Sequence, residues 1–402
     1  MSGISKVLKR QLAPIGVVIV LLVVVAGCGG GGSSSSSTSS GGESGGAETA
    51  SNSEAGEGAT ADSPGLTEAE QIVSEHEKAP TEIGVSTPIK KGVPKDKTIA
   101  FINEGTEAEI NVGRGIEAAA DAVGWKVKTI NAEPVPAVLQ GAMEEAIRKN
   151  PDFIAFVGVN AEEVSRQLEQ AKAAGIPVIA SHSLQKNGEE GITANVLPVQ
   201  VAEKYMEVLA AKTAVDVGPE GGEVLVDYLT GFPLPLYYTN AYVSALEKFC
   251  PTCTIKKQNI QPTSIGKDAP QQICNQLRTM SDVKGVVLSY DAIGIGINAA
   301  CKSAGVTLPP VYTYAPDAPG VEELKNEEKK AGAPLDYGDD GAAYVDTAIR
   351  IANGESLDEV EDATADMPIW AAEYGNLPED PSKLTYIVPN GLEQWEKLWG
   401  LK

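Results

Sequence analysis

Residues 171–180 read AKAAGIPVIA and hold, within ten positions, the end of a helix, a stop and the start of a buried strand. The alanines continue the apolar spacing of a helix over 162–174, Gly175 ends that helix, and 177–180 form a short apolar run. The same order precedes this stretch. It predicts strands at 98–103, 126–131 and 153–157, with helices at 113–123 and 135–149.

The strand–helix rhythm begins again after residue 198. It predicts helices at 199–212, 237–249, 269–280, 292–304 and 344–352, and strands at 223–228, 254–258, 285–289 and 311–314. Alternating strands and helices are typical of parallel sheets covered on both faces, so we expect an α/β protein with two doubly wound lobes. Because ligands of such folds bind at the carboxyl ends of the strands, the cleft between the lobes is the expected site.

The first 27 residues have the form of an export signal. Lys6, Lys9 and Arg10 precede an apolar run over 12–25, which is shorter than the roughly 20 residues a membrane-spanning helix needs. The run ends in Val-Ala-Gly-Cys at 25–28, which matches a bacterial lipobox. We therefore predict a signal peptide at 1–27 and a lipid on Cys28. A plain secretory signal or a short anchor, with an incidental cysteine, is the alternative.

Residues 28–95 are expected to be a flexible tether. Gly, Ser, Ala, Thr and Glu dominate positions 29–65, and such a composition buries too little apolar surface to offset the entropy of ordering. Residues 66–79 have the pattern of a short helix, with Ser63 as its cap. We expect this helix to be marginal and His76 within it to be solvated.

Charge and motifs exclude several classes of protein. The chain has 55 acidic and 32 basic residues, a net charge of −23, so its surface repels nucleic-acid phosphates. It has no phosphate-binding loop of the G-x-x-x-x-G-K-S/T type and no H-E-x-x-H zinc motif. Residues 294–299 read GIGINA, but four residues separate them from the preceding predicted strand, so we interpret these glycines as packing positions. No cofactor or metal is expected.

Three segments carry a resemblance to a known family. They are GIEAA at 115–119, NPDFI at 150–154 and AKAAGIPVI at 171–179. In order and spacing, residues 97–355 resemble the sugar-type, type I periplasmic binding proteins, the solute receptors of ABC importers. The resemblance implies lobes that close on a ligand and are joined by three crossings. It places 96–194 and 340–366 in the first lobe, and 195–339 and 367–402 in the second.

The resemblance also implies where the ligand residues lie. The candidates follow strands or occupy matching positions: Glu104, His182, Phe232, Tyr237, Tyr290, Asp291, Tyr314 and Asp339. Several family features are replaced. The loop at 104–109 (EGTEAE) has no aromatic residue for stacking on a sugar. His182 and Ser183 stand where the family usually has an Asp-Arg pair. Ribose-like sugars, polyols, a furanosyl signalling molecule and a cationic aromatic-bearing solute therefore all stay open as ligands.

Four cysteines follow Cys28. An even number outside the cytoplasm favours disulfides over a redox or metal site, and three pairings are open. We favour Cys250 with Cys253, which are three residues apart, and Cys274 with Cys301, which lie on successive predicted helices.

Taken together, the sequence predicts a monomeric, lipid-anchored protein on the outer face of the cell membrane. It would capture a small carbohydrate-like ligand and deliver it to ABC permease and ATPase subunits, without catalysis. A receptor of the same fold for a sensor system is one alternative. An extracytoplasmic enzyme is another, for which Asp339 and Asp340 would be the paired carboxylates.

Overall fold

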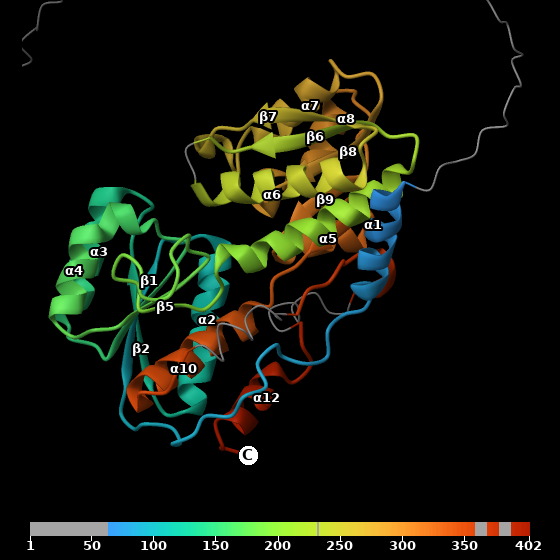
Figure 1. Cartoon of the computed structure of the whole chain (residues 1–402). Helices are drawn as coiled ribbons and strands as arrows, with labels where there is room; N and C mark the ends of the chain where they lie inside the picture. The colour runs from blue at the N-terminus through green and yellow to red at the C-terminus, as the bar shows by residue number, and fades with distance from the viewer. Residues whose placement is uncertain (1–62, 231–232, 358–367, 378–386) are drawn as a thin grey trace, which may run out of the picture. The chain divides into compact units, whose positions relative to one another are not determined.

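The computed structural model describes residues 63–230, 233–357, 368–377 and 387–402 (Figure 1). The predicted leader, Cys28 and Phe232 lie outside these residues. None of the helices within the described ranges is long and apolar enough to cross a membrane.

Five parallel strands form the first sheet, in the order β2-β1-β3-β4-β5. They are β1 (Thr98–Asn103), β2 (Lys126–Asn131), β3 (Phe153–Val157), β4 (Val178–Ser181) and β5 (Ala194–Asn195). The sheet is covered by α2 (Glu107–Ala122), α3 (Pro136–Arg148), η1 (Ala161–Val164), α4 (Ser165–Ala173) and α10 (Tyr337–Asn353). Successive residues of β1 point to opposite faces. Ile99 and Phe101 therefore pack with α2 and α10, whereas Ala100 and Ile102 pack with α3 and α4.

The second sheet is also parallel and has the order β10-β9-β8-β6-β7. Its strands are β6 (Gly222–Tyr228), β7 (Cys253–Asn259), β8 (Val283–Leu288), β9 (Val311–Tyr314) and β10 (Ala331–Ala333). Its helices are α5 (Val199–Val217), α6 (Pro233–Phe249), η2 (Pro262–Ser264), α7 (Ala269–Leu277), η3 (Asp291–Ile293), α8 (Ile297–Ser303) and α9 (Ala318–Lys325). Val224 and Val226 face α5 and α6, and Leu225 faces α7 and α8. The predicted α/β class with two parallel-sheet lobes is confirmed.

Two crossings between the lobes lie in the described residues, at 196–198 and 334–336. The third expected crossing, after α10, falls in the undescribed range 358–367. Helix α10 belongs with the first lobe because it crosses α2 where both helices have glycine. A Cβ atom on Gly341 would lie 2.3 Å from the backbone of Gly115, so only glycine allows this approach. The crossing fixes the start of α10 against the first lobe.

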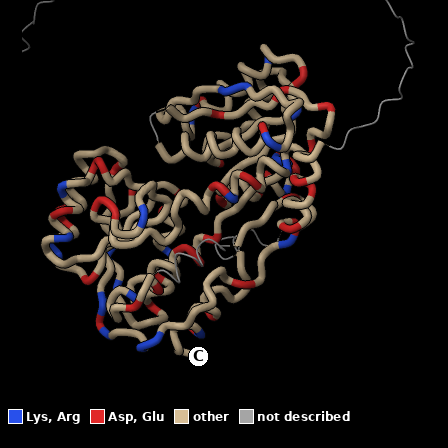
Figure 2. Tube along the Cα trace, in the orientation of Figure 1, with Lys and Arg blue, Asp and Glu red and all other residues tan. Residues whose placement is uncertain are grey.

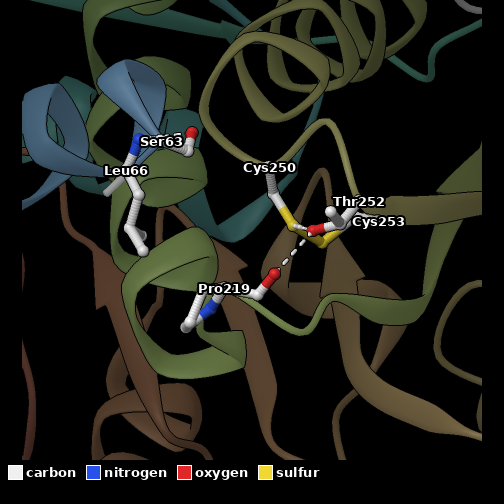
Figure 3. Close-up of a disulfide and its surroundings, with 6 residues drawn as sticks. All are labelled: Ser63, Leu66, Pro219, Cys250, Thr252 and Cys253. Atoms are coloured by element: carbon white, nitrogen blue, oxygen red, sulfur yellow. Dashed lines mark hydrogen bonds between the residues drawn. A yellow bond between two sulfur atoms is a disulfide. The ribbon is translucent and has the colours of Figure 1, made fainter. Parts of the chain in front are cut away.

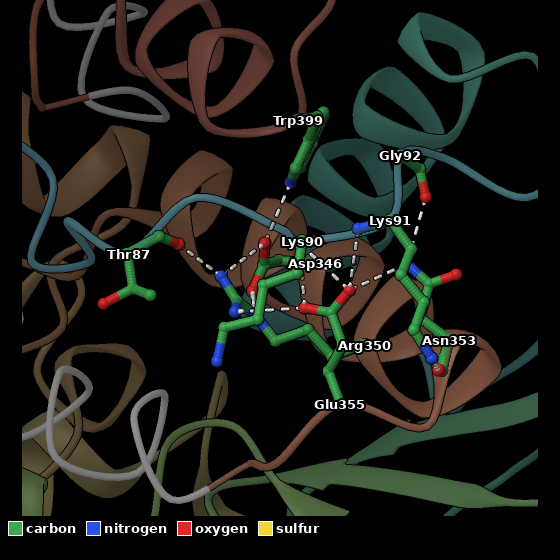
Figure 4. Close-up of polar contacts among 9 residues, drawn as sticks. All are labelled: Thr87, Lys90, Lys91, Gly92, Asp346, Arg350, Asn353, Glu355 and Trp399. Atoms are coloured by element: carbon green, nitrogen blue, oxygen red, sulfur yellow. Dashed lines mark hydrogen bonds and ion pairs between the residues drawn. The ribbon is translucent and has the colours of Figure 1, made fainter.

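The N-terminal strap, residues 63–95, corrects the prediction of a tether that extends to residue 95. Helix α1 (Pro64–Glu75) forms with Ser63 as its N-cap, as expected, but it packs on α5 and α6 and buries Ala69 completely. The strap then follows the first lobe, where Thr87 O accepts a bond from Arg350 (Figure 4). Ile89 N donates to Leu398 O. Tertiary contacts thus order a segment whose polar composition suggested a free chain.

The C-terminal segment divides between the lobes, which corrects the assignment of all of 367–402 to the second lobe. Ala372 pairs with Gly332 beside β10, next to the turn η4 (Tyr374–Asn376), so residues 368–377 lie on the second lobe. Helix α12 (Gly391–Leu398) instead packs on α10, because the indole N–H groups of Trp395 and Trp399 donate to buried carboxylates of that helix.

The structure pairs Cys250 with Cys253 and Cys274 with Cys301, the connectivity that the sequence favoured. Cys250 directly follows α6, one of the helices on which α1 packs. Thr252, between the paired cysteines, donates to Pro219 O (Figure 3). Cys274 and Cys301 join α7 to α8 and are fully buried. Both bridges therefore lie in the second lobe.

We expect the two disulfides to differ in their contribution to stability. Replacing Cys274 and Cys301 by alanine should lower the free energy of unfolding by about 3–4 kcal/mol, because a longer closed loop restricts the unfolded chain more. The sequence separations are 27 residues for that pair and 3 for Cys250–Cys253, whose removal should cost about 2 kcal/mol. Urea titrations of the two double variants would measure this. A larger loss for the Cys250–Cys253 variant would contradict the loop argument.

Candidate functional site

The carboxyl ends of strands β1, β4, β8 and β9 bring most of the candidate residues to one region between the lobes. From the first lobe come Glu104, which follows β1, and His182, which follows β4. From the second come Tyr290, which follows β8, and Tyr314, the last residue of β9. In parallel sheets all these ends lie at the same edge, which explains the convergence.

His182 connects the two lobes directly. Its Nδ1 atom lies 3.1 Å from the hydroxyl of Tyr238 on α6, and its Nε2 atom lies 3.6 Å from Oδ2 of Asp340 on α10. The residue is buried and has a left-handed backbone with φ of 50°. One imidazole thus contacts groups of both lobes.

Three tyrosines packed edge to face form the second-lobe wall of the site. The rings of Tyr238 and Tyr314 meet edge to face at 5.0 Å, and Tyr205 of α5 meets Tyr314 at 5.9 Å. Burial raises the pKa of all three hydroxyls, so they are neutral at physiological pH. Aromatic rings with neutral hydroxyls offer apolar faces and hydrogen-bonding edges to a solute.

Two glutamates line the first-lobe side. Burial, followed by the charges of Glu109 and Glu163, raises the pKa of Glu104 to about 7. Burial also raises the pKa of Glu109 to about 7, although hydrogen bonds from the loop at 104–106 act against it. Glu109 is only 7% exposed, and its Oε2 atom has no hydrogen-bond partner among the described residues. Helix α2 begins at 107 rather than 113, because Thr106 caps it, and this places Glu109 in the site.

Asp291 is held by the second lobe itself. Its Oδ1 atom accepts bonds from Lys329 Nζ at 2.5 Å and from Thr313 Oγ1 at 2.8 Å, and all of its surface is buried. Burial raises the pKa of Asp291 to about 6, while Lys329 and Thr313 act in the opposite direction. Asp291 thus connects the loop after β8 to β9 and to Lys329, and its Oδ1 atom already has two protein donors.

Two neighbouring aspartates of α10 point in different directions. Asp339, the residue expected from the sequence, accepts a bond from the indole of Trp395 on α12 at 2.5 Å. Asp340 instead lies beside His182, and its Oδ2 atom is 3.5 Å from Ser181 Oγ. Its Oδ1 atom has no hydrogen-bond partner in the described part of the chain. The structure therefore brings Asp340, and not Asp339, to the cluster at His182.

Tyr237 and Tyr238 form a similar pair on α6. The hydroxyl of Tyr237 donates to Glu203 of α5, and burial together with this glutamate raises its pKa to about 12. Tyr238 faces His182. The sequence prediction named Tyr237 and missed Tyr238, Asp340 and Glu109. Helical periodicity could have indicated Asp340. Tyr344 lies four residues later, on the same face of α10, and its hydroxyl donates to Phe156 O of the first sheet.

Other features of the chain do not mark the site. Acidic residues are spread over both lobes, so the net charge by itself does not single out the cleft (Figure 2). A cavity of about 490 Å³ lies near Pro310, Lys330 and Glu373, where β9 begins, away from the carboxyl ends of the strands. Within the described ranges, no group of three or more side chains is arranged to hold a metal ion.

Comparison with solved structures reveals the same fold. A solute-binding protein of an ABC transporter from Agrobacterium vitis, with bound α-D-tagatopyranose, is 20% identical; the match covers 72% of this chain and 99% of that one, with a TM-score of 0.60. One from Actinobacillus succinogenes with bound D-allose is 18% identical over 70% and 98% of the two chains, with a TM-score of 0.59.

A third similar structure is the XylFII–LytSN complex, at 14% identity and a TM-score of 0.59, covering 71% of this chain and 100% of that one. No curated protein matches the sequence. The family model for the periplasmic binding protein domain matches residues 93–356, well over half of the chain. The chain therefore belongs to the periplasmic binding protein domain family, with the type I fold of the solute-binding proteins of sugar ABC transporters.

Proposed function

We propose that this protein is an extracytoplasmic solute-binding protein, anchored through a lipid on Cys28, that captures a small hydroxylated solute between its lobes. The observation that carries this proposal is the buried polar cluster at the strand ends. His182 and Asp340 of the first lobe meet Tyr238 and Tyr314 of the second lobe there. An oxygen of Asp340 without a protein partner is available to a ligand hydroxyl.

The proposed action is capture, lobe closure and release to ABC permease and ATPase subunits, without a covalent step. Hinge-type closure would bring Tyr238 and Tyr314 onto a solute held by the first lobe, and the solute would bridge the lobes as His182 does here. Glu104 and Tyr290 are proposed at the rim of the site. Phe232 stays a candidate from the sequence.

The similar solved structures support a hydroxylated solute, because their ligands are α-D-tagatopyranose and D-allose. A receptor that signals to another protein is a second candidate, supported by the similarity to the XylFII–LytSN complex. The enzyme alternative has less support. Asp339 and Asp340 point to different partners, so they do not flank a common position where a bond could be cleaved.

The matched variants Asp340→Asn and Asp339→Asn test the site. A screen of sugars and polyols should find a compound that raises the unfolding temperature of the unmodified chain, since ligand at one hundred times Kd adds about 2.7 kcal/mol. We expect Asp340→Asn to abolish this ligand-induced rise. Asp339→Asn should lower the starting temperature through its contact with Trp395 but keep the rise. The reverse pattern, or no stabilising compound at all, would contradict the proposal.

A further inference from the structure

Carboxyl groups face the site from both lobes. Glu104 and Glu109 belong to the first lobe, and Asp317 precedes α9 in the second. Burial is the larger cause in each case, but the charge of Glu109 also raises the pKa of Glu104 and of Tyr290 across the cleft. Glu107 in turn contributes to the raised pKa of Asp317. Like charges of the two lobes are therefore close enough to repel one another.

The lysine that acts on Asp317 already has partners of its own. Lys329 acts on Asp317, yet its ammonium lies 2.5 Å from Oδ1 of Asp291 and 2.8 Å from the carboxylate of Glu323. It has no exposed surface. The charges that act on Glu104 are those of Glu109 and Glu163, both acidic. The acidic groups of the first lobe thus face the cleft without a protein counter-ion among these neighbours.

Unpartnered buried atoms add an independent observation. The hydroxyl of Tyr337, at the start of α10, has no hydrogen-bond partner among the described residues although the residue is only 3% exposed. Burial and the neighbouring Tyr290, Tyr314 and Asp317 raise its pKa, which places this hydroxyl in the same region. Glu109 Oε2 and Asp340 Oδ1 are unpartnered as well. Buried polar atoms nearly always have a partner, so these atoms indicate the positions of ligand donors.

From these observations we propose that the solute carries a protonated amine in addition to hydroxyl groups, with Glu109 as its counter-ion. This inference rests on the proposed binding function and narrows its ligand class. An ammonium group has three donors and no acceptor, so it complements carboxylate oxygens that lack partners. Hydroxyls of the same molecule would bond to the tyrosine and histidine groups of the site. An organic cation fits better than a metal ion, since the described residues offer no metal-binding cluster.

The pH dependence of binding follows from the same groups. Without ligand, burial raises the pKa of Glu104 and of Glu109 to about 7. The charge of Glu163 also acts on Glu104, and the charge of Glu109 acts on Tyr290 and Tyr344. A cation binds the ionised form, so binding should release protons and the dissociation constant should fall as the pH rises from 6 to 8. A neutral polyol would lack this dependence, or would bind better at low pH by accepting bonds from protonated carboxyls.

Isothermal titration of the full chain with matched pairs tests the inference. The pairs are 1-amino-1-deoxy-D-sorbitol with D-sorbitol and 2-amino-2-deoxy-D-glucose with D-glucose, and putrescine serves as a charge without hydroxyls. We expect an amine to bind roughly tenfold more tightly than its parent, as one additional charge-assisted hydrogen bond allows. Glu109→Gln should reduce this preference to about threefold or less. Glu117→Gln, an exposed residue on the same helix that bonds to Thr129, should leave it unchanged.

Each outcome of the titration separates the two proposals. If a parent compound binds as tightly as its amine, the solute is neutral: the inference is overturned and the binding function stands. If no member of the panel binds, the binding function loses its support as well. Tightest binding by putrescine would contradict the hydroxyl part of the inference. The comparison within each pair uses the unmodified protein, so it holds even if Glu109→Gln fails to fold.

Discussion

Replacing Arg350 with alanine is expected to lower the free energy of unfolding by about 3–5 kcal/mol. Arg350 is 1% exposed, and its guanidinium lies 2.6 Å from Oδ2 of Asp346 and 3.8 Å from the carboxylate of Glu355 (Figure 4). It also donates to Thr87 O of the N-terminal strap. Without the arginine, the buried carboxylates of Asp346 and Glu355 would lose this shared cation.

An exposed pair with the same spacing provides the control for Arg350→Ala. Lys149 and Glu145 also lie one helical turn apart, but their side chains are 43% and 44% exposed. Water solvates both charges there, so Lys149→Ala should change stability little. Urea unfolding monitored by circular dichroism would compare the two variants. Equal losses would show that burial of the Arg350 pair is not what makes it important.

Removal of the N-terminal strap is expected to have a larger effect still. A chain that starts at residue 96 should lose on the order of 5 kcal/mol or more, because it exposes the surfaces that now cover Ala69 and Val85. It also removes backbone partners from Arg350, Leu398 and Trp125. Because whole domains are stable by only about 5–15 kcal/mol, much of this chain should be unfolded at 37 °C.

A second truncation shows whether the loss of stability comes from residues 63–95 or from the residues before them. A chain that starts at residue 63 keeps α1 and all strap contacts, so its unfolding temperature should match that of the longer mature chain. Thermal unfolding by circular dichroism would compare starts at 28, 63 and 96. If the chain from residue 96 unfolds at the same temperature as the others, then the strap contributes nothing and the sequence prediction of a tether up to residue 95 is right.

Local pattern predicted the strands better than the helices. The apolar run at 98–103 matches β1 in both bounds, because a buried strand needs consecutive apolar residues, and the alternating pattern at 126–131 matches the edge strand β2. Helix α10 was expected from 344 and begins at Tyr337, since its first turn buries Asp339 and Asp340, which look like loop residues. Strand β10 reads Ala-Gly-Ala and has no side-chain pattern to recognise.

At two positions, the structure brings to the cluster at His182 the neighbour of the residue that the sequence named. Neighbouring residues on a helix point about 100° apart, so choosing between Asp339 and Asp340, or between Tyr237 and Tyr238, requires the orientation of the helix. In this chain, Asp339 accepts a hydrogen bond from Trp395 of α12, which leaves Asp340 beside His182. In the second pair, Tyr237 donates to Glu203 of α5, and Tyr238 lies beside His182. His182, which follows β4, and Tyr314, which ends β9, were named from their positions at strand ends together with the family resemblance.

The sequence by itself determined the two-lobed α/β fold and the edge of each sheet where the candidate site lies, because periodic burial and turn residues act over short stretches of chain. Only the tertiary structure decided which carboxylates enter the site and that residues 63–95 belong to the folded body. Those outcomes depend on pairs such as Thr87 with Arg350, which are 263 residues apart. Such contacts stabilise a segment only after both partners are buried together, and no local pattern records them.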